Sequence, residues 1–300
     1  MTHVATLISN PAKPALDDTV LARARAALPS AKDPVWLDPG IAADIPFTPA
    51  AANDQRALAG QVRTALAGRP IDVVVQPVAH RRKQLFLADM DSTMIGQECI
   101  DELADYAGLK AHVAAITERA MRGEIAFEPA LRERVALLKG LPQTVAGEVI
   151  EKRIVLTPGG KTLIATMRAN GAYTCLVSGG FTLFTQKIGA MIGFDEDRSN
   201  MLLVDGDARL SGKVAEPILG KEAKLDTLRE LQMRLGLAPE ETMAIGDGAN
   251  DIPMIEAAGL GVAYHGKPAV AEAAAARIDH GDLTALLYAQ GYPRTAFVTP

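Results

Sequence analysis

Short apolar runs, separated by longer amphipathic stretches, mark the chain from residue 84 onward. They lie at Leu85–Ala88, Tyr173–Val177, Met201–Val204, Thr242–Ile245 and Leu260–Ala263. These runs show little alternation between apolar and polar residues, as expected of strands that are buried on both faces. Because amphipathic stretches connect them, the pattern predicts an α/β fold with a parallel sheet covered by helices on both faces.

The stretch between the first two of these strands is long and helical in pattern. Amphipathic segments follow one another from residue 97 to residue 153, and glycines at 108, 123 and 140 separate them. A helical insertion at this point lies over the carboxyl ends of the strands, where α/β sheets bind ligands. We therefore expect a helical cap at 97–153 that acts as a substrate lid, and a catalytic core formed by 84–96 and 154–295.

The first 80 residues show the pattern of a separate α+β unit. The expected elements are strand Val4–Ser9, helix Asp17–Leu28, a short strand Val35–Leu37 with a partner near Ile45, helix Ala57–Ala67 and strand Asp72–Val78. This order predicts a small N-terminal domain at 1–80 with ferredoxin-like connectivity. Most of Pro34–Asn53 is expected to be irregular loop, and the basic run His80–Lys83 a solvated linker. The domain weakly resembles the ACT-like regulatory modules that precede some amino-acid enzymes.

Acidic residues directly follow two of the predicted buried strands. Asp89 and Asp91 come after the first strand, and Asp247 lies in the glycine-containing turn Gly246–Asp251 after the fourth. Because parallel strands end at the same edge of a sheet, these carboxylates are expected to lie close together. Their mutual repulsion calls for a cation or ligand, and oxygen ligands with room for water and phosphate suit Mg²⁺. Helix caps and turn aspartates are the ordinary alternative.

A turn of small residues lies between these two acidic clusters. The strand Tyr173–Val177 runs into Ser178, Gly179 and Gly180, which open a helix. A hydroxyl and free backbone N–H groups at a helix N-terminus can bind a phosphate. Lys224 follows on an amphipathic helix, where a lysine is ordinarily solvated.

Composition narrows the class of partner. The 300 residues carry a formal net charge of -5, so a small-molecule substrate is expected, and neither nucleic acid nor a membrane is expected as a partner. No apolar run is long enough to cross a bilayer, and the first residues lack the pattern of a secretory leader, which favours the cytoplasm. The cysteines and histidines show no disulfide or metal-ligand spacing.

Taken in order, these motifs resemble those of the haloacid dehalogenase superfamily. The corresponding positions are Asp89–Thr93 for the DxD motif, Ser178, Lys224, and Gly246–Asp251 for the GDxxxD motif. Residues 85 to 290 resemble more closely the phosphoserine phosphatases, in which a helical cap follows the first motif. The matching stretches include Phe127–Val135 and Val177–Phe181. The resemblance implies a Rossmann-like core and Mg²⁺-dependent hydrolysis of O-phospho-L-serine to L-serine and phosphate, the last step of serine biosynthesis.

The resemblance also implies roles for individual residues. It places Glu98, Phe127, Arg134, Ser178, Gly179, Lys224 and Asn250 against the substrate, and Asp89, Asp91 and Asp247 around Mg²⁺. Asp89 is then the expected nucleophile, which becomes an aspartyl phosphate, and Asp91 the general acid and base. Glu98 can pair with the substrate ammonium and Arg134 with its carboxylate, while Phe127 supplies an apolar wall.

Two other functions stay open at this point. A related phosphatase or phosphotransferase on the same scaffold could act on another small molecule, such as phosphohomoserine. The scaffold could also bind phosphorylated metabolites without turning them over, although the presence of both Asp89 and Asp91 favours an enzyme. The sequence leaves the oligomeric state open, and a homodimer is compatible with it.

Overall fold

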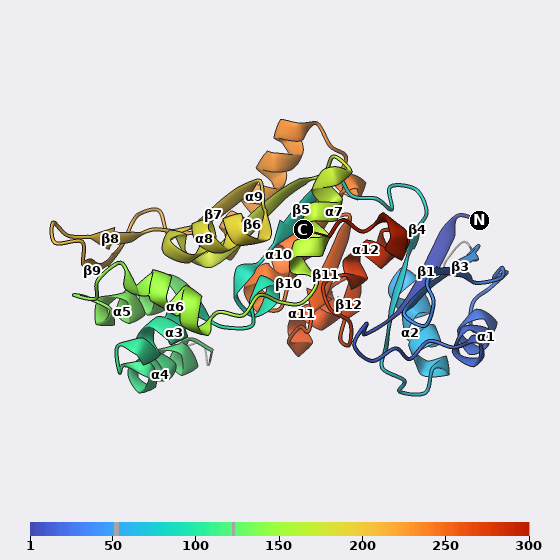
Figure 1. Cartoon of the computed structure of the whole chain (residues 1–300), viewed down its shortest axis with the longest axis horizontal. Coiled ribbons are helices and arrows are strands. Elements are labelled where there is room, and N and C mark those ends of the chain that lie inside the picture. The colour runs from blue at the N-terminus through green and yellow to red at the C-terminus, as the bar shows by residue number, and fades with distance from the viewer. Residues whose placement is uncertain (51–53, 122–123, 300) are drawn as a thin grey trace.

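A six-stranded sheet forms the centre of the computed structural model, which describes residues 1–50, 54–121 and 124–299 (Figure 1). Its strands are β5 (Leu85–Ala88), β6 (Tyr173–Phe181), β7 (Glu196–Asn200), β10 (Thr242–Gly246), β11 (Leu260–Tyr264) and β12 (Ala276–Ile278). They lie in the order β12-β11-β10-β5-β6-β7, and all neighbours run parallel. The predicted α/β fold is therefore confirmed, with β5 between β10 and β6.

Both faces of the sheet are buried under helices. The covering helices are α7 (Gly160–Ala169), α8 (Thr182–Ile192), α9 (Lys221–Leu235), α10 (Ile252–Ala257), α11 (Pro268–Ala273) and α12 (Ala285–Ala289). Phe86 of β5 packs in the apolar core that includes Leu163 of α7, whereas Leu87 packs in the core that includes Leu228 of α9. Burial on both sides explains why these strands are apolar without alternation.

The prediction that Met201–Val204 is a strand of this sheet is wrong. Residues 202–204 form β8 (Leu202–Val204), which pairs antiparallel with β9 (Leu210–Val214) in a separate hairpin. The sheet strand is instead β7, whose sequence Glu-Asp-Arg-Ser-Asn carries no apolar run. An edge strand is paired on one side only and leaves side chains in contact with solvent, so its polar sequence gives no strand signal.

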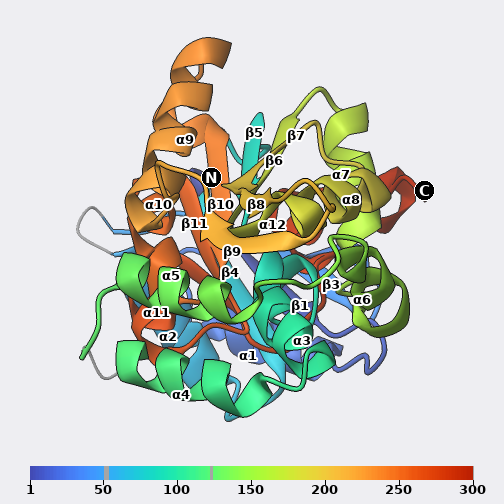
Figure 2. The same cartoon turned by 90° about the vertical axis from the view of Figure 1, so that its left-hand side faces the viewer.

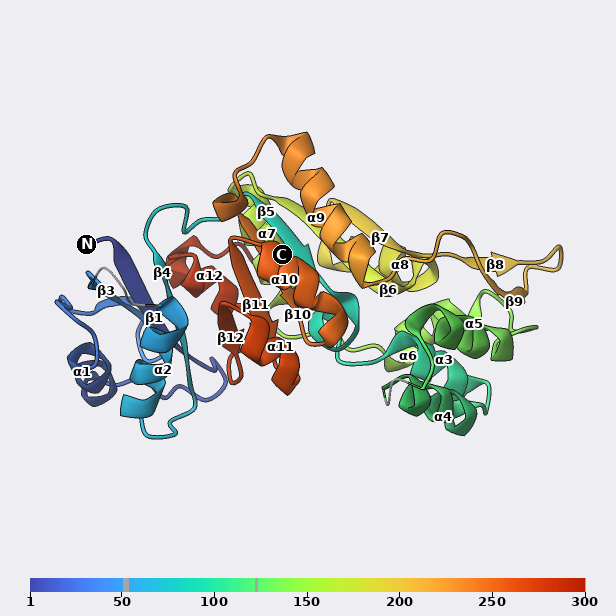
Figure 3. The same cartoon turned by 180° about the vertical axis from the view of Figure 1, so that it is seen from behind.

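The segment between β5 and β6 contains the predicted helical cap. Its helices are α3 (Cys99–Tyr106), α4 (Lys110–Met121), α5 (Phe127–Leu137) and α6 (Val145–Arg153); Arg122 and Gly123, which the prediction included, lie outside the described residues. The two connections to the core meet in an antiparallel bridge between Ile95 and Leu156. Figures 1 and 3 show the cap and the N-terminal unit at opposite ends of the sheet.

The β8–β9 hairpin binds the cap through backbone hydrogen bonds. The Gly140 N–H donates to the Leu210 carbonyl oxygen, and the Leu210 N–H donates to the Leu141 carbonyl oxygen, both at 2.8 Å. Seen from the end that carries the cap, the hairpin lies above the cap helices (Figure 2). The cap is therefore attached to the core by this hairpin as well as by its two chain connections.

The N-terminal residues form a four-stranded antiparallel sheet with two helices. Its elements are β1 (His3–Ser9), α1 (Asp18–Ala26), β2 (Val35–Asp38), β3 (Ala42–Phe47), α2 (Gln55–Ala65) and β4 (Ile71–Pro77). The strand order β2-β3-β1-β4 confirms the ferredoxin-like connectivity. The loop predicted over Pro34–Asn53 is wrong for 35–38 and 42–47, because β3 lies inside the sheet with Ile45 and Phe47 fully buried. Residues 51–53 lie outside the described residues.

The basic run His80–Lys83 is only in part the solvated linker that its charge predicts: His80 and Arg82 are exposed, whereas Arg81 and Lys83 are enclosed. The Arg81 guanidinium donates to both carboxylate oxygens of Asp44 at 2.6 Å and to the carbonyl oxygen of Ala289 at 2.8 Å. The Lys83 side chain is buried, and its Nζ donates to the Glu240 carbonyl oxygen at 2.6 Å. These cations are buried because they satisfy carboxylate and carbonyl groups where the N-terminal unit meets the core.

In the described part of the chain, no helix has the length and apolar character needed to span a membrane.

Candidate active site

Asp89 and Asp247 reach the same edge of the sheet because their strands are neighbours. Ala88, at the end of β5, lies opposite Ile245 of β10 in parallel register. Asp89 follows immediately, and its Oδ1 accepts a hydrogen bond at 2.8 Å from the Met90 N–H at the start of a tight turn. Asp247 lies one residue beyond the end of β10. Parallel pairing of two buried strands thus brings both carboxylates to one place.

The carboxylates of Asp89, Asp247 and Asp251 form a compact buried cluster. Each offers an oxygen that lies within 4.8 Å of the oxygens of the other two. Carboxylate oxygens gathered this closely fit a hard divalent cation and repel one another without one. The metal ligands predicted from the sequence were Asp89, Asp91 and Asp247. The cluster in the structure contains Asp251 in place of Asp91. The Gly246–Asp251 motif held the signal for Asp251, a second carboxylate in the same turn, but sequence reasoning did not select it.

Lys224 lies buried between two of these carboxylates. Its Nζ is 2.7 Å from Asp89 Oδ1 and 2.6 Å from Asp251 Oδ1. Burial alone lowers the pKa of Lys224, but Asp89 and Asp251 outweigh that effect and hold the pKa above its ordinary value. Burial and the neighbouring Asp89 raise the pKa of Asp251 to about 7, although Lys224 opposes them. The lysine is an internal counter-ion, not the solvated side chain typical of helices.

Asp91 lies beside the acidic cluster with one carboxylate oxygen buried. Its Oδ2 accepts a hydrogen bond from the Cys99 N–H at 3.1 Å, while its buried Oδ1 has no partner among the described residues. Burial, followed by the charges of Glu98 and Asp89, raises the pKa of Asp91 well above its usual value. Glu98 is held by the Ser92 hydroxyl, which donates to Glu98 Oε1 at 2.7 Å. This arrangement favours a protonated carboxyl group at Asp91.

The segment Ser178–Gly180, predicted as a turn that opens a helix, belongs to the end of β6, which continues to Phe181 before α8 begins at Thr182. It has the close packing expected of an anion-binding segment. The Gly180 N–H donates to Ser178 Oγ at 2.9 Å, and Asn200 Nδ2 donates to the Gly179 carbonyl oxygen at 2.9 Å. A Cβ atom added to Gly180 would lie 3.1 Å from Ser178 Oγ, tighter than most contacts of that kind. This end of β6 therefore presents a hydroxyl and backbone groups to the site without bulky side chains.

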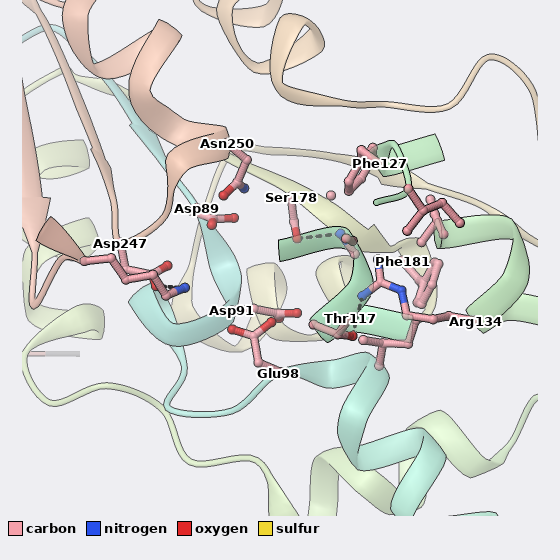
Figure 4. Close-up of a pocket in the computed structure, with 17 residues that line it drawn as sticks. Asp89, Asp91, Glu98, Thr117, Phe127, Arg134, Ser178, Phe181, Asp247 and Asn250 are labelled. Atoms are coloured by element: carbon pink, nitrogen blue, oxygen red, sulfur yellow. Dashed lines mark hydrogen bonds and ion pairs between the residues drawn. The ribbon is translucent and has the colours of Figure 1, made fainter. Parts of the chain in front are cut away.

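A cavity of about 360 Å³ joins these core residues to the cap. Of the predicted site residues it is lined by Asp89, Asp91, Glu98, Phe127, Arg134, Ser178, Gly179, Asp247 and Asn250. Figure 4 shows the acidic groups and Ser178 on the core side, and Arg134 and Phe127 approaching from the cap. Lys224, which contacts Asp89 at 2.7 Å, is not among the lining residues. Nine of the predicted site residues, from distant parts of the sequence, thus line one cavity.

Arg134 is the cationic residue on the cap side of the cavity. Its Nε donates to the Ala130 carbonyl oxygen at 3.3 Å, and its Nη1 lies 3.4 Å from Thr117 Oγ1. Burial lowers the pKa of this guanidinium, and the charges of Asp101 and Glu98 partly restore it; an arginine stays charged under such conditions. The cavity therefore presents a fixed cation at one end and carboxylates at the other.

Sequence reasoning missed Lys267, which also lines the cavity. Its Nζ lies 3.1 Å from Asp247 Oδ2. The residue stands alone after β11, in no motif that was recognised, so only the folded structure reveals it.

The family of the chain follows from comparison with known sequences. Residues 86–256 match the model of the haloacid dehalogenase-like hydrolases, a range that runs from β5 to α10 and contains the whole acidic cluster. The chain belongs to this family. The superfamily predicted from the four motifs is thereby confirmed.

Three similar members of this hydrolase family extend the comparison. A phosphoserine phosphatase from Polaromonas sp. (strain JS666) is 47% identical over 209 residues, covering 68% of this chain and 88% of the relative. The crystal structure of a HAD family hydrolase from Salmonella enterica serovar Typhi matches with a TM-score of 0.85 and 30% identity, covering 96% of this chain and 97% of the other. A probable phosphoserine phosphatase from Vibrio cholerae, in unliganded form, matches with a TM-score of 0.78 and 29% identity over 98% of this chain and 88% of the other. The last two similarities include the N-terminal unit and confirm the predicted fold.

Proposed function

We propose that this hydrolase is a phosphoserine phosphatase. The observation that carries the proposal is the single cavity that joins Asp89 and the acidic cluster to Glu98 and Arg134. A phosphate ester of an amino acid carries an ammonium and a carboxylate beyond its phosphate, and Glu98 and Arg134 have the complementary charges. The 47% identical phosphoserine phosphatase from Polaromonas supports the same function.

Asp89 is the proposed nucleophile. It lies at the end of β5, lines the cavity and is held by the Lys224 ammonium at 2.7 Å. A carboxylate attacks phosphorus effectively when the phosphate is fixed in line with it and the negative charge is offset. The attack forms the aspartyl phosphate and breaks the bond from phosphorus to the serine oxygen.

Asp91 is the proposed general acid and base. Its enclosed Oδ1, which has no hydrogen-bond partner in the described structure, is available to carry the proton that the leaving serine oxygen needs. After this transfer the carboxylate can accept a proton from the water that hydrolyses the aspartyl phosphate. One group thus serves both halves of the reaction.

Mg²⁺ is the cation we propose for the acidic cluster. Asp89 and Asp247 would hold it, and Asp251 lies beside them within the same 4.8 Å cluster. When bound, the ion supplies positive charge that offsets the repulsion between carboxylates and a dianionic phosphate. Asp91, which the sequence placed at the ion, remains a predicted member of this site.

The remaining contacts divide between the phosphate and the amino acid. Ser178, Gly179 and the Lys224 ammonium are proposed to hold phosphate oxygens, and Asn250 lines the same side of the cavity. Phe127, on the cap, lies close enough to Gly179 that an added Cβ there would be 3.6 Å from its ring. Closure of this contact over the substrate would exclude water from the reacting centre.

The experiment that tests the function is phosphate release from phosphoserine with and without Mg²⁺, repeated with an aryl phosphate and with phosphohomoserine. We expect Mg²⁺-dependent release and a preference for phosphoserine. In Arg134→Ala the loss should be far larger on phosphoserine than on the aryl phosphate, because only the former has a carboxylate to pair. Equal losses on both substrates would remove Arg134 from substrate recognition. Binding of phosphoserine without release would favour a non-catalytic metabolite sensor.

We also propose that the protein is located in the cytoplasm and forms a homodimer. The two buried free thiols, Cys99 and Cys175, suit a reducing compartment. Cell fractionation tests the location and light scattering tests the oligomeric state. The predicted domain limits, 1–80, 97–153 and the two core segments, can be tested by limited proteolysis.

A further inference from the structure

Lys267 contacts Asp247 through both its side chain and its backbone. Its Nζ lies 3.1 Å from Asp247 Oδ2, and its backbone N–H donates to the Asp247 carbonyl oxygen at 2.9 Å. Lys267 immediately precedes α11, in the turn that leaves β11. One residue outside the recognised motifs therefore holds both the main chain and the carboxylate of Asp247.

An exposed ion pair alone would be weak evidence for a role. The side chain of Lys267 is 56% exposed, and surface pairs of this kind contribute little to stability. The backbone hydrogen bond distinguishes this contact from such a pair, because it fixes the spacing between the turn and Asp247 whatever the side chain does. The side chain also lines the cavity that contains Asp89, Asp91 and Glu98.

The turn that carries Lys267 is held in an unfavourable backbone conformation. His265 has φ +44°, which is uncommon for a residue with a side chain. Gly266 follows, and a Cβ atom there would lie 2.8 Å from Val270 Cγ1. Such a conformation persists only where the surroundings hold it. Here the His265 N–H donates to the Ile278 carbonyl oxygen at 2.8 Å, and its ring Nε2 lies 3.1 Å from the Gly281 carbonyl oxygen.

The N-terminal unit supports this turn through Asp72. Asp72, on β4, is only 2% exposed, and its carboxylate accepts hydrogen bonds from the backbone N–H groups of Asp279 at 2.8 Å and Gly281 at 2.7 Å. The same loop segment offers the Gly281 carbonyl oxygen to His265. A continuous set of contacts therefore runs from Asp72 through the 279–281 loop and His265 to Lys267.

We propose that Lys267 is a positioning residue for Asp247 and that Asp72 supports it by holding the 265–267 turn. The proposal rests on the role of Asp247 as a cation ligand in the proposed function. A carboxylate that is already held in one orientation loses less conformational freedom when a cation binds. The N-terminal unit is then a structural support of the cation site.

The first test is a calorimetric Mg²⁺ titration of the wild type, Lys267→Gln and Lys267→Met. The two variants have lost the same charge, but only glutamine retains an N–H donor for Asp247. We expect Mg²⁺ to bind about fivefold more weakly to the Met variant than to the Gln variant. Equal affinities of the two variants would overturn the positioning role. A wild type that does not bind Mg²⁺ would instead refute the proposed cation site itself.

The second test compares Asp72→Asn with Asp17→Asn. Both remove one carboxylate from the N-terminal unit, but Asp17 caps α1 through the Val20 N–H, away from the 279–281 loop. Asp72→Asn should speed amide hydrogen exchange at 265–267 and weaken Mg²⁺ binding about threefold, whereas Asp17→Asn should do neither. Unchanged exchange at 265–267 in Asp72→Asn would overturn the support.

A double-variant cycle and a backup variant complete the test. In a Lys267→Met background, Asp72→Asn should weaken Mg²⁺ binding less than it does in the wild type, because the side-chain contact is already lost and only the backbone hydrogen bond of residue 267 to Asp247 remains. An undiminished effect would overturn the route through the Lys267 side chain. If Asp72→Asn does not fold, Asn10→Ala replaces it, since Asn10 Nδ2 donates to the His280 carbonyl oxygen at 2.9 Å on the same loop. Amide hydrogen exchange at 265–267 that is no faster in Asn10→Ala than in the wild type would likewise overturn the support.

Discussion

Opposite charges are in direct contact around Asp89, and these contacts determine how a substitution of Asp89 affects the stability of the fold. The Lys224 ammonium contacts both Asp89 and Asp251, so removal of one carboxylate leaves the buried lysine with a partner. A buried ammonium left with no carboxylate would cost the fold far more. The catalytic role and the structural role of Asp89 are therefore separable by mutation.

Asp89→Asn is expected to abolish turnover while the fold remains intact. The amide matches the carboxylate in shape but is a far weaker nucleophile, and loss of a nucleophile lowers kcat by about 10⁴-fold or more. Phosphate release from phosphoserine measures the loss, and circular dichroism checks the fold. Persistent activity in the purified variant would refute the assignment of Asp89 as the nucleophile.

Lys83 links the stability of the fold to pH. Burial lowers its pKa to about 8, and Glu240 and Glu241 only partly oppose this, whereas the pKa of a lysine in the unfolded chain is about 10.4. Between these values the unfolded chain binds a proton that the folded chain does not. The contribution of Lys83 to the free energy of unfolding therefore rises with pH from about 8 to about 10 and is constant below that range.

Lys83→Met should remove this rise. Urea unfolding of wild type and variant at about pH 8 and about pH 10 measures it, and the other titrating groups cancel in the comparison of the two proteins. We expect the wild type to gain stability relative to the variant as the pH rises, by an amount on the order of 1 to 3 kcal/mol. An equal change in both proteins would contradict the low pKa.

The β8–β9 hairpin shows how one element restrains another. Gly212 of β9 has φ +78°, and a Cβ atom there would lie 2.9 Å from Lys139 Cβ and 3.3 Å from the Ala136 carbonyl oxygen, at the end of α5. Hairpin and cap approach so closely here that only glycine fits without a shift. Any movement of the cap relative to the core must therefore carry the hairpin with it or break their shared backbone hydrogen bonds.

Gly212→Ala should weaken the attachment of the cap to the hairpin. The left-handed backbone and the contact with Lys139 together are expected to cost about 2 kcal/mol. Gly206→Ala is the matched control, because a Cβ atom there meets nothing within 4 Å. Urea unfolding and limited proteolysis of the 137–143 segment compare the two variants; equal behaviour would show that the hairpin does not hold the cap.

Across the whole molecule, the N-terminal unit and the core meet through buried polar contacts. Arg81 and Asp44 form an ion pair with side-chain exposures of 13% and 11%. Within the N-terminal unit the Thr6 hydroxyl donates to Asp44 Oδ1, and across the junction Arg81 Nε and Gln76 Nε2 donate to the Ala289 carbonyl oxygen at 2.8 and 2.7 Å. Polar contacts of this kind require a fixed relative placement of the two parts, because each group left unpaired is costly.

Arg81→Met should destabilise the junction strongly. It leaves the Asp44 carboxylate buried without its cation, which typically costs about 3 to 5 kcal/mol. Arg82→Met is the control, since Arg82 is exposed and lies over the Tyr292 ring at 4.3 Å, a contact worth about 1 kcal/mol or less. Urea unfolding measures both, and a loss for Arg81→Met no greater than for Arg82→Met would contradict the buried pair.

The sequence by itself determined the fold class, the cap and nine of the residues that line the cavity. Buried strands have a local signature, because burial on both faces demands continuous apolar residues, as in Leu85–Ala88 and Thr242–Ile245. The carboxylates that come directly after these strands are positioned by them. Of the nine predicted residues that line the cavity, Asp89, Asp91, Ser178, Gly179 and Asp247 follow from these strand ends. The other four, Glu98, Phe127, Arg134 and Asn250, were found through the resemblance to phosphoserine phosphatases, and the chemical roles of all nine remain proposals.

Only the tertiary structure decided which charges are buried and what they contact. The polar edge strand β7, the ion pair of Arg81 with Asp44, the position of Lys224 between two carboxylates and the contact of Lys267 with Asp247 all join residues from separate parts of the chain. A charged side chain looks the same in sequence whether it is solvated or paired. Its environment is fixed by the packing of distant elements, and that information is not present in any local pattern.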